Sequence, residues 1–178
     1  LLDSQTAGSA VAFSTDHGVF LVARGEDAKS SPVRLEDRSG QAMAFSPDGR
    51  MLVCSVDELD VLIFDVKRRS KLDTLRVSGV PSGHKFSWTG ELLGIPMVNN
   101  QAEIWNFPRR QRLATLKGHR DLVSGLAFGI EEGCVFTCSL DATVRRWDWR
   151  REKELQVLRG ALMRFEDVCL SPDGLRLA

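Results

Sequence analysis

Short apolar or alternating stretches follow one another along the whole chain and are separated by turn-forming residues. Two Ser-Pro-Asp-Gly tetrads, at 46–49 and 171–174, are typical of tight turns, because Pro presets φ and Gly accepts positive φ. No window sustains a 3.6-residue period, so we expect an all-β chain with almost no α-helix. In the best-marked part of the chain, strands are predicted at about 122–128, 134–139, 143–149 and 154–158.

Three series of residues repeat with a common period. Spacings of 41, 42 and 42 residues separate the first series, Phe45, Phe86, Phe128 and Leu170. Spacings of 41 and 42 separate the second, Phe64, Trp105 and Trp147. The third consists of Leu72-Asp73-Thr74-Leu75, Leu113-Ala114-Thr115-Leu116 and Leu155-Gln156-Val157-Leu158. Each repeat is therefore about 42 residues long and is predicted to form a four-stranded antiparallel meander.

The period divides the chain into five units, which we place at about 1–39, 40–79, 80–117, 118–159 and 160–178. The last unit stops inside its expected second strand, which predicts a truncated repeat. The first keeps Ala12-Phe13-Ser14, which we align with Ala44-Phe45-Ser46. Because these two triplets are only 32 residues apart, the first unit is predicted to lack a strand or to have a shortened loop.

The unit at 118–159 resembles the WD-repeat family signature. The resemblance lies in Leu116-Lys117-Gly118-His119, Leu126-Ala127-Phe128, Ser139-Leu140-Asp141 and Val144-Arg145-Arg146-Trp147-Asp148. It implies β-propeller blades of four-stranded antiparallel sheets, about four of them with a truncated fifth. It also implies a structural hydrogen-bond network of His119, Ser139, Asp141 and Trp147, running from the turn before the first strand to the third strand.

The other units depart from the signature. The second has Phe64-Asp65 in place of Trp-Asp and no histidine before its first strand. The third has Trp105-Asn106 and offers Asn99 where the turn aspartate belongs. Only about 40 residues carry the full signature, whereas the repeat pattern covers most of the chain.

A hydrolytic triad of Ser139, His119 and Asp141 is the alternative interpretation of the same residue types. Two observations argue against it: the resemblance places Trp147 on the serine, and the chain has no Gly-x-Ser-x-Gly loop. We expect no catalytic, cofactor-binding or metal-binding residue. The four cysteines form no CxxC pair and have no histidine at metal-ligand spacing.

Composition narrows the partners and the compartment. The 24 basic and 24 acidic residues produce no field of one sign, which argues against nucleic acid, and the basic clusters are interpreted as solvated turns. No run approaches 18 apolar residues, so no membrane span is predicted. Four thiols in apolar runs and a start without a secretory signal favour a cytoplasmic, reducing location.

The resemblance implies that partners dock on the propeller face beside the network. We predict that the partner-binding residues are Arg120, Leu122, Leu140, Leu162 and Arg164. An apolar side chain next to arginine suits an interaction hot spot. The leading hypothesis is a non-catalytic scaffold for protein–protein interaction.

Two further hypotheses concern what lies outside the 178 residues. The repeats can instead be the regulatory or substrate-recruiting part of a larger enzyme, such as a kinase or NTPase, whose catalytic domain lies elsewhere. Propeller closure is expected from missing sequence or from another chain, because an open end exposes a sheet edge and an apolar flank.

Overall fold

The structure is a computed structural model that describes residues 4–7, 10–23, 31–159, 164–171, 173–174 and 176–178. The chain divides into two compact units, unit 1 (Leu1–Ser78) and unit 2 (Gly79–Ala178). Each contains two four-stranded sheets, numbered sheets 1 to 4 in chain order. The described residues include one helical turn, the 3₁₀ turn η1 at Trp149–Arg151, so the prediction of an all-β chain is confirmed.

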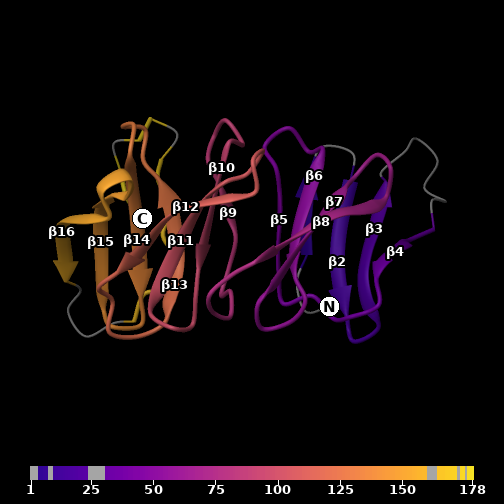
Figure 1. Ribbon diagram of the computed structural model, residues 1–178, viewed down its shortest axis with the longest axis horizontal. Coiled ribbons are helices and arrows are strands. Elements are labelled where there is room, and N and C mark those ends of the chain that lie inside the picture. Colours follow the sequence, from indigo (N-terminus) through magenta and orange to yellow (C-terminus); the bar gives the residue numbers. More distant parts are fainter. Residues whose placement is uncertain (1–3, 8–9, 24–30, 160–163, 172, 175) are drawn as a thin grey trace. The chain divides into compact units, whose positions relative to one another are not determined.

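Unit 1 holds sheets 1 and 2, whose strands pair in chain order (Figure 1). Sheet 1 comprises β1 (Ser4–Ala7), β2 (Ala10–Thr15), β3 (Gly18–Ala23) and β4 (Val33–Glu36). Sheet 2 comprises β5 (Ala42–Phe45), β6 (Met51–Ser55), β7 (Asp60–Asp65) and β8 (Ser70–Arg76). All pairs are antiparallel, as the predicted meander requires.

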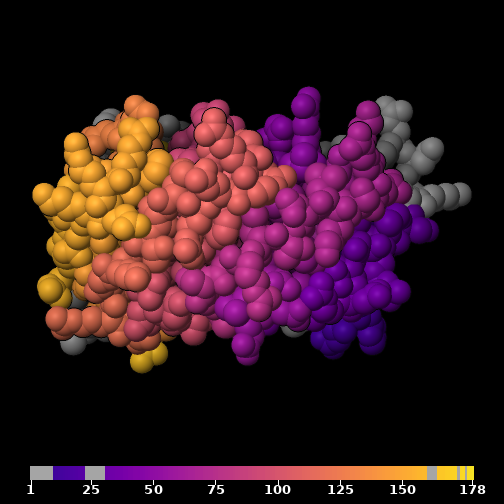
Figure 2. Space-filling model, in the orientation of Figure 1, coloured from indigo at the N-terminus to yellow at the C-terminus, as the bar shows by residue number. Residues whose placement is uncertain are grey.

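Unit 2 repeats this arrangement. Sheet 3 comprises β9 (Lys85–Phe86), β10 (Leu92–Pro96), β11 (Gln101–Asn106) and β12 (Gln111–Lys117). Sheet 4 comprises β13 (Val123–Phe128), β14 (Cys134–Ser139), β15 (Thr143–Asp148) and β16 (Lys153–Arg159). The bounds in sheet 4 differ from the predicted ones by at most one residue at each end. In Figure 2 consecutive residues form continuous colour bands within each unit, as a meander dictates.

A meander places its loops alternately at the two ends of each sheet. We call end A the end with the loops from first to second and from third to fourth strand. End B carries the loop from second to third strand and the loop that enters the first strand. In sheet 4, residues 129–133 and 149–152 lie at end A, whereas 118–122 and 140–142 lie at end B.

Sheet 1 corrects the prediction for the first unit. Phe13 lies on β2, the second strand, whereas Phe45 lies on β5, the first strand of sheet 2. Aligning these two phenylalanines was therefore wrong, and it produced the short spacing of 32. Sheet 1 has all four strands, and β2 and β3 are joined by a tight turn in which Thr15 pairs with Gly18.

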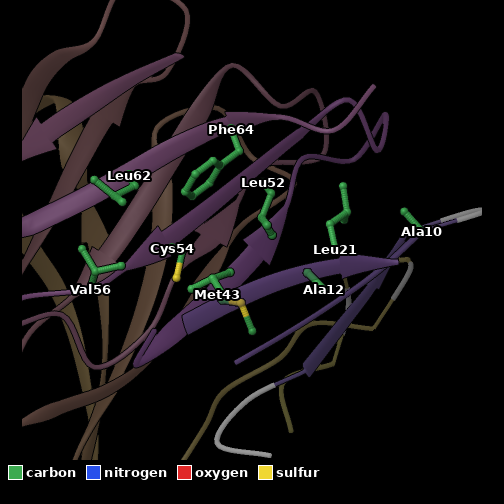
Figure 3. Close-up of a cluster of buried hydrophobic side chains, with 10 residues drawn as sticks. Ala10, Ala12, Leu21, Met43, Leu52, Cys54, Val56, Leu62 and Phe64 are labelled. Atoms are coloured by element: carbon green, nitrogen blue, oxygen red, sulfur yellow. The ribbon is translucent and has the colours of Figure 1, made fainter. Parts of the chain in front are cut away.

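The core of unit 1 lies between its two sheets (Figure 3). Ala12 and Leu21 of sheet 1 belong to one apolar cluster with Met43 and Leu52 of sheet 2. Phe64, a member of the second repeat series, is 0% exposed in this cluster. Burying a side chain of this size contributes about 2–3 kcal/mol, so the repeated aromatic position stabilises the sheet pair.

The core of unit 2 is built in the same way. Ile104 and Leu116 of sheet 3 pack with Leu126 and Trp147 of sheet 4. The two sheets come so close that a Cβ placed on Gly94 of β10 would lie 2.5 Å from the Leu126 side chain. A larger residue at this position would therefore push the sheets apart.

The leucine series marks a bulge on each outer strand. Between the third and fourth strands of sheets 2 to 4 the register skips one residue, which is Leu72, Leu113 or Leu155. These bulge residues are 42%, 39% and 49% exposed. The leucines three positions after the bulges differ in exposure between sheets 3 and 4. Leu116 is 2% exposed and packs against sheet 4, whereas Leu158 is 42% exposed.

Residues 164–178 begin a further repeat. Leu170 bridges Leu177 in antiparallel fashion, as the first two strands of a sheet would. The hydroxyl of Ser124 donates to the carbonyl of Phe165, 41 residues later (2.5 Å). The hydroxyl of Ser82 donates in the same way to the carbonyl of Val123 (2.5 Å). The segment is therefore hydrogen-bonded to sheet 4 in the same way as sheet 4 is hydrogen-bonded to the residues that precede sheet 3.

Candidate functional site

A line of side-chain hydrogen bonds crosses sheet 4 from its third strand to the loop at end B. Trp147 Nε1 on β15 donates to Thr137 Oγ1 on β14 (2.8 Å). Thr137 Oγ1 lies 2.7 Å from His119 Nε2, and His119 Nδ1 lies 3.0 Å from Asp141 Oδ2. The line thus ties two strands to the entry loop and to the turn between β14 and β15.

The groups along this line favour a neutral imidazole. The ionised Asp141 carboxylate only accepts, so the facing Nδ1 carries a hydrogen, and the Trp147 indole only donates, so Thr137 Oγ1 accepts from it. In the neutral ring, Nε2 then accepts from the Thr137 hydroxyl. Burial lowers the pKa of His119 and outweighs the opposing effect of Asp141, which favours this neutral form.

Asp141 is the acceptor on which the end B loops converge. Its carboxylate accepts from the backbone N–H of Arg120 (2.9 Å), and from the backbone N–H and the hydroxyl of Thr143 (3.0 and 2.5 Å). Burial raises the pKa of this carboxyl, but the hydrogen bonds from Thr143, Arg120 and His119 outweigh burial and lower it to about 2. Asp141 is therefore ionised at neutral pH.

Thr137, His119 and Asp141 have the bonding order of a nucleophile, a base and an acid. Thr137 is nevertheless 0% exposed, and its oxygen is held between the imidazole and the indole of Trp147. No substrate can approach that oxygen. At about 1 kcal/mol net for each bond, the line contributes about 3 kcal/mol to stability.

Ser139 lies outside this line, so its predicted place in the network is wrong. Its hydroxyl donates to the carbonyl of Asp121 and accepts from the backbone N–H of Asp141, both at 3.0 Å, and thereby closes the turn. Thr137 takes the predicted place because residues i and i+2 of a strand share a face. Three of the four predicted residues, His119, Asp141 and Trp147, do come together.

Sheet 3 satisfies its tryptophan differently, which the sequence analysis missed. Trp105 Nε1 donates to Glu103 Oε2 (2.8 Å), and Arg112 on the outer strand binds Glu103 Oε1 (2.8 Å). Glu103 is 0% exposed. The available hint was the apolar residue Ile95 on β10, which offers the Trp105 indole no hydroxyl acceptor.

The predicted partner-binding residues of sheet 4 lie at end B. Arg120 is exposed, whereas Leu122 and Leu140 are half-buried and adjacent, since the Leu140 N–H donates to the Leu122 carbonyl (3.1 Å). Arg164 is exposed at the start of the further repeat, next to Phe165, whose carbonyl binds Ser124. Leu162 lies outside the described residues.

Val98 joins this end and was not predicted. It follows Met97, whose carbonyl accepts from the N–H of Val123 (3.2 Å), and it is 46% exposed. Val98, Leu122 and Leu140 therefore occupy consecutive loops of end B in unit 2. The loop 97–100 corresponds to 139–142, and this correspondence could have revealed it.

Other site classes can be surveyed over the described residues. Cys54, Cys134 and Cys138 are free and buried, whereas the free Cys169 is exposed although it lies in an apolar run of the sequence. Within the ranges that the structure describes, no group of His, Cys, Asp and Glu is arranged to hold a metal ion. The same ranges contain no helix with the length and apolar character that crossing a bilayer requires.

Comparison with known proteins agrees with the fold and its repeat. The WD domain, G-beta repeat family matches residues 110–148. The WD40 repeats of RRP9 superpose on 76% of this chain and 43% of that chain, with a TM-score of 0.68 at 23% identity, a likeness of fold alone. Residues 110–148 therefore carry a WD repeat, and the four antiparallel sheets match the blades of WD40-repeat propellers. Proteins of this class generally act as scaffolds for protein interaction and are typically non-catalytic.

Its curated relatives are longer. Apoptotic protease-activating factor 1 of Danio rerio is 28% identical over 130 residues, 71% of this chain and 10% of that protein. Nuclear distribution protein PAC1 of Arthroderma benhamiae is 28% identical over 165 residues, 92% of this chain and 34% of that protein. The COMPASS component SWD3 of Saccharomyces cerevisiae is 29% identical over 121 residues, 67% of this chain and 35% of that protein. The chain spans about a third or less of each.

Proposed function

We propose that this chain is a non-catalytic docking platform that holds a protein partner on end B of unit 2. The observation that supports the proposal is the set of apolar side chains Val98, Leu122 and Leu140 on consecutive loops, with Arg120 beside them. Arginine is one of the residues that supply most of the binding energy at protein interfaces, and the side chains around such a residue exclude water from it.

The buried network makes this surface rigid. The Arg120 N–H and the His119 ring both bind Asp141, which fixes the entry loop to the turn that carries Leu140. Ser139 adds a bond from this turn to the carbonyl of Asp121. A loop already held in one conformation loses little entropy on binding, so more of the contact energy appears as affinity.

The test replaces Arg120, Leu122 and Leu140 together by alanine and measures capture of interacting proteins from native lysate by quantitative mass spectrometry. The matched control removes the same residue types from outer strands, as L72A/L113A/R159A. We expect the end B variant to lose its specific partners and the control to keep them, with unchanged far-UV spectra. Equal capture by both variants would contradict the proposal.

A further blade is proposed to cover the outer flank of sheet 4, from longer sequence or from another chain. Leu158 supports this, because its equivalent Leu116 is 2% exposed against the next sheet, whereas Leu158 is 42% exposed. The 178 residues alone should bind the hydrophobic dye ANS, and L158E should remove part of that signal. A chain that melts cooperatively without binding dye would overturn this proposal.

A role as the recruiting part of a larger enzyme is the second candidate. The matched region makes up 10% of apoptotic protease-activating factor 1, so repeats of this kind occur within much longer polypeptides. Sequencing the complete reading frame tests the idea. A glycine-rich phosphate loop followed by lysine would support it, and a frame containing only propeller repeats would exclude it.

A further inference from the structure

The loops between third and fourth strands repeat one design at end A. In sheet 2, Asp65 Oδ1 accepts from the backbone N–H of Arg68 (2.7 Å), and its carboxylate lies 3.9 Å from the Arg68 guanidinium. In sheet 4, Asp148 accepts from the N–H of Arg151 (3.3 Å) and binds its guanidinium (3.0 Å). Each exposed arginine therefore has its own acid.

Sheet 3 keeps this loop but loses the acid. Asn106 Oδ1 accepts from the N–H of Arg109 (2.9 Å), so the loop closes in the same way. Asparagine brings no charge, however, and Arg109 forms no ion pair with any described residue. The neighbouring cations are engaged, because Arg112 binds Glu103 and Arg110 lies 4.4 Å from the centre of the Phe107 ring.

A second exchange occurs in the other end A loop of the same sheet. The Gly90 N–H donates to the Ser87 carbonyl, forming the same turn as Gly49 and Ser46 in sheet 2. The residue after the serine is Pro47 in sheet 2 and Pro172 in the last segment, but Trp88 in sheet 3. Trp88 is 65% exposed.

The two exchanges belong to one local surface. The Phe107 N–H donates to the Glu91 carbonyl (2.8 Å), which ties the two loops together, and the rings of Phe86 and Phe107 pack edge to face at 4.8 Å. Because the loops are two strand spacings apart in sheet 3, their centres are separated by about 10 Å. An extended peptide covers that distance in about three residues.

We propose that Trp88 and Arg109 form a second docking site, at end A of sheet 3, for an acidic segment of a partner protein. A carboxylate of that segment pairs with Arg109, and an apolar side chain about three residues away packs on the indole of Trp88. Both site residues belong to the types that dominate interface hot spots. The site is separate from the proposed surface at end B, because it uses the opposite loops.

A nucleic acid strand fits this surface less well. Binding a polyanion draws on several cations along one track, whereas Arg109 is the single arginine of its loop without an engagement, and the loop of Trp88 contributes the exposed acid Glu91. The single cation Arg109 and the single aromatic ring of Trp88 are separated by about the length of three extended residues. They therefore match a peptide with one carboxylate and one apolar side chain about three residues apart.

The test selects twelve-residue peptides displayed on phage against the full chain, then titrates fluorescein-labelled versions by anisotropy. We expect Asp or Glu about three residues from Phe, Leu or Ile, and a tenfold or greater loss when that acid becomes its amide. W88P and N106D should each weaken binding at least tenfold. Both substitutions copy residues that equivalent loops already contain, so the fold should persist, as far-UV spectra and melting will check.

Matched controls separate this site from the others. D65N removes the acid beside Arg68 in sheet 2, where proline replaces the tryptophan, and should leave affinity unchanged. R120A/L122A/L140A should also leave it unchanged, whatever becomes of partners at end B. The proposal is overturned if the selection enriches no peptide, if W88P and N106D bind with full affinity, or if only the end B variant loses binding. It is also overturned if a 20-nucleotide oligothymidine binds more tightly than the peptides and W88P weakens that binding, or if the chain forms a dimer that W88P dissociates.

Discussion

Glu103 and Arg145 stand at the same register position in sheets 3 and 4 and carry opposite charges. Each lies two residues before the tryptophan of its sheet, and each binds the outer-strand residue that pairs with that tryptophan. The Glu103 carboxylate binds Arg112 (2.8 Å), and the Arg145 guanidinium binds Glu154 (2.5 Å). The ion pair is kept while its direction is reversed, so neither charge alone can be exchanged freely.

R112A should therefore destabilise the chain by about 2–3 kcal/mol, because it leaves the buried Glu103 carboxylate without its cation. Half exposure of Arg112 keeps the loss below that of a fully buried pair. Urea unfolding measures it. In the background E103L/W105F, which copies Leu62 and Phe64 of sheet 2, the same R112A change should cost less than about 0.5 kcal/mol. Equal losses in both backgrounds would show that Arg112 acts through packing alone.

Thr137 and Ser139 can be distinguished by a pair of single variants. T137V leaves the Trp147 N–H and His119 Nε2 without partners in the interior and should cost about 2–4 kcal/mol. S139A removes bonds only at the turn and should cost about 1–2 kcal/mol. The decisive readout is the Trp147 indole N–H resonance in a proton–nitrogen NMR spectrum, which should shift in T137V and stay in place in S139A. A shift in S139A alone would restore Ser139 to the network.

Stability should fall as the solution is acidified below pH 6.5. Burial lowers the pKa of His84 from 6.5 to about 3, and burial likewise lowers the pKa of His119. The unfolded chain then binds more protons than the folded chain, so this contribution is complete above pH 6.5 and is lost as the pH falls toward the folded values. Each histidine contributes a slope of at most about 1.4 kcal/mol per pH unit.

Urea titrations at pH 7.5, 6.5, 5.5 and 5.0 measure that slope. H84Q and H119Q should each flatten it. Asp141, with its pKa near 2, should add a further loss of stability below about pH 4. A slope that H119Q leaves intact would contradict the neutral state assigned to His119.

Two left-handed loop residues should respond differently to replacement by glycine. Arg69 and Glu152 occupy the same loop position with φ of 54° and 51°. R69G relieves this conformation and should raise the free energy of unfolding by about 0.5–1 kcal/mol. Glu152 also accepts from the backbone N–H of Thr115 on β12 (2.7 Å), so E152G should bring no gain. Thermal unfolding compares the two, and stabilisation by E152G would show that this bond contributes little.

Much of the fold could be predicted from the sequence because a feature found in one repeat can be checked at the equivalent position of the next. Phe64, Trp105 and Trp147 each fill a buried place on a third strand, and their common spacing located the sheets. Phe13 misled because an apolar residue before a serine fits a first or a second strand equally well. Only hydrogen-bonded pairing decides between them.

The candidate site was predicted less completely. His119, Asp141 and Trp147 were found through residue types that match one signature, whereas Thr137 is an ordinary strand residue until its neighbours are known. Val98 and Trp88 matter only through their exposure, which depends on how loops from separate strands meet. From the sequence alone, Glu103 would be assigned to the surface, because the sequence does not show that its carboxylate binds both Trp105 and Arg112.

The serine bonds from Ser82 to Val123 and from Ser124 to Phe165 set each first strand against its successor. Each of these joints links the start of one repeat to the start of the next, and the two serines are 42 residues apart, the length of one repeat. A gene that gains or loses one whole period would therefore preserve every joint, whereas a partial insertion would break one. This arrangement lets blade number change by duplication in whole steps while sequences drift as far apart as those of sheets 3 and 4.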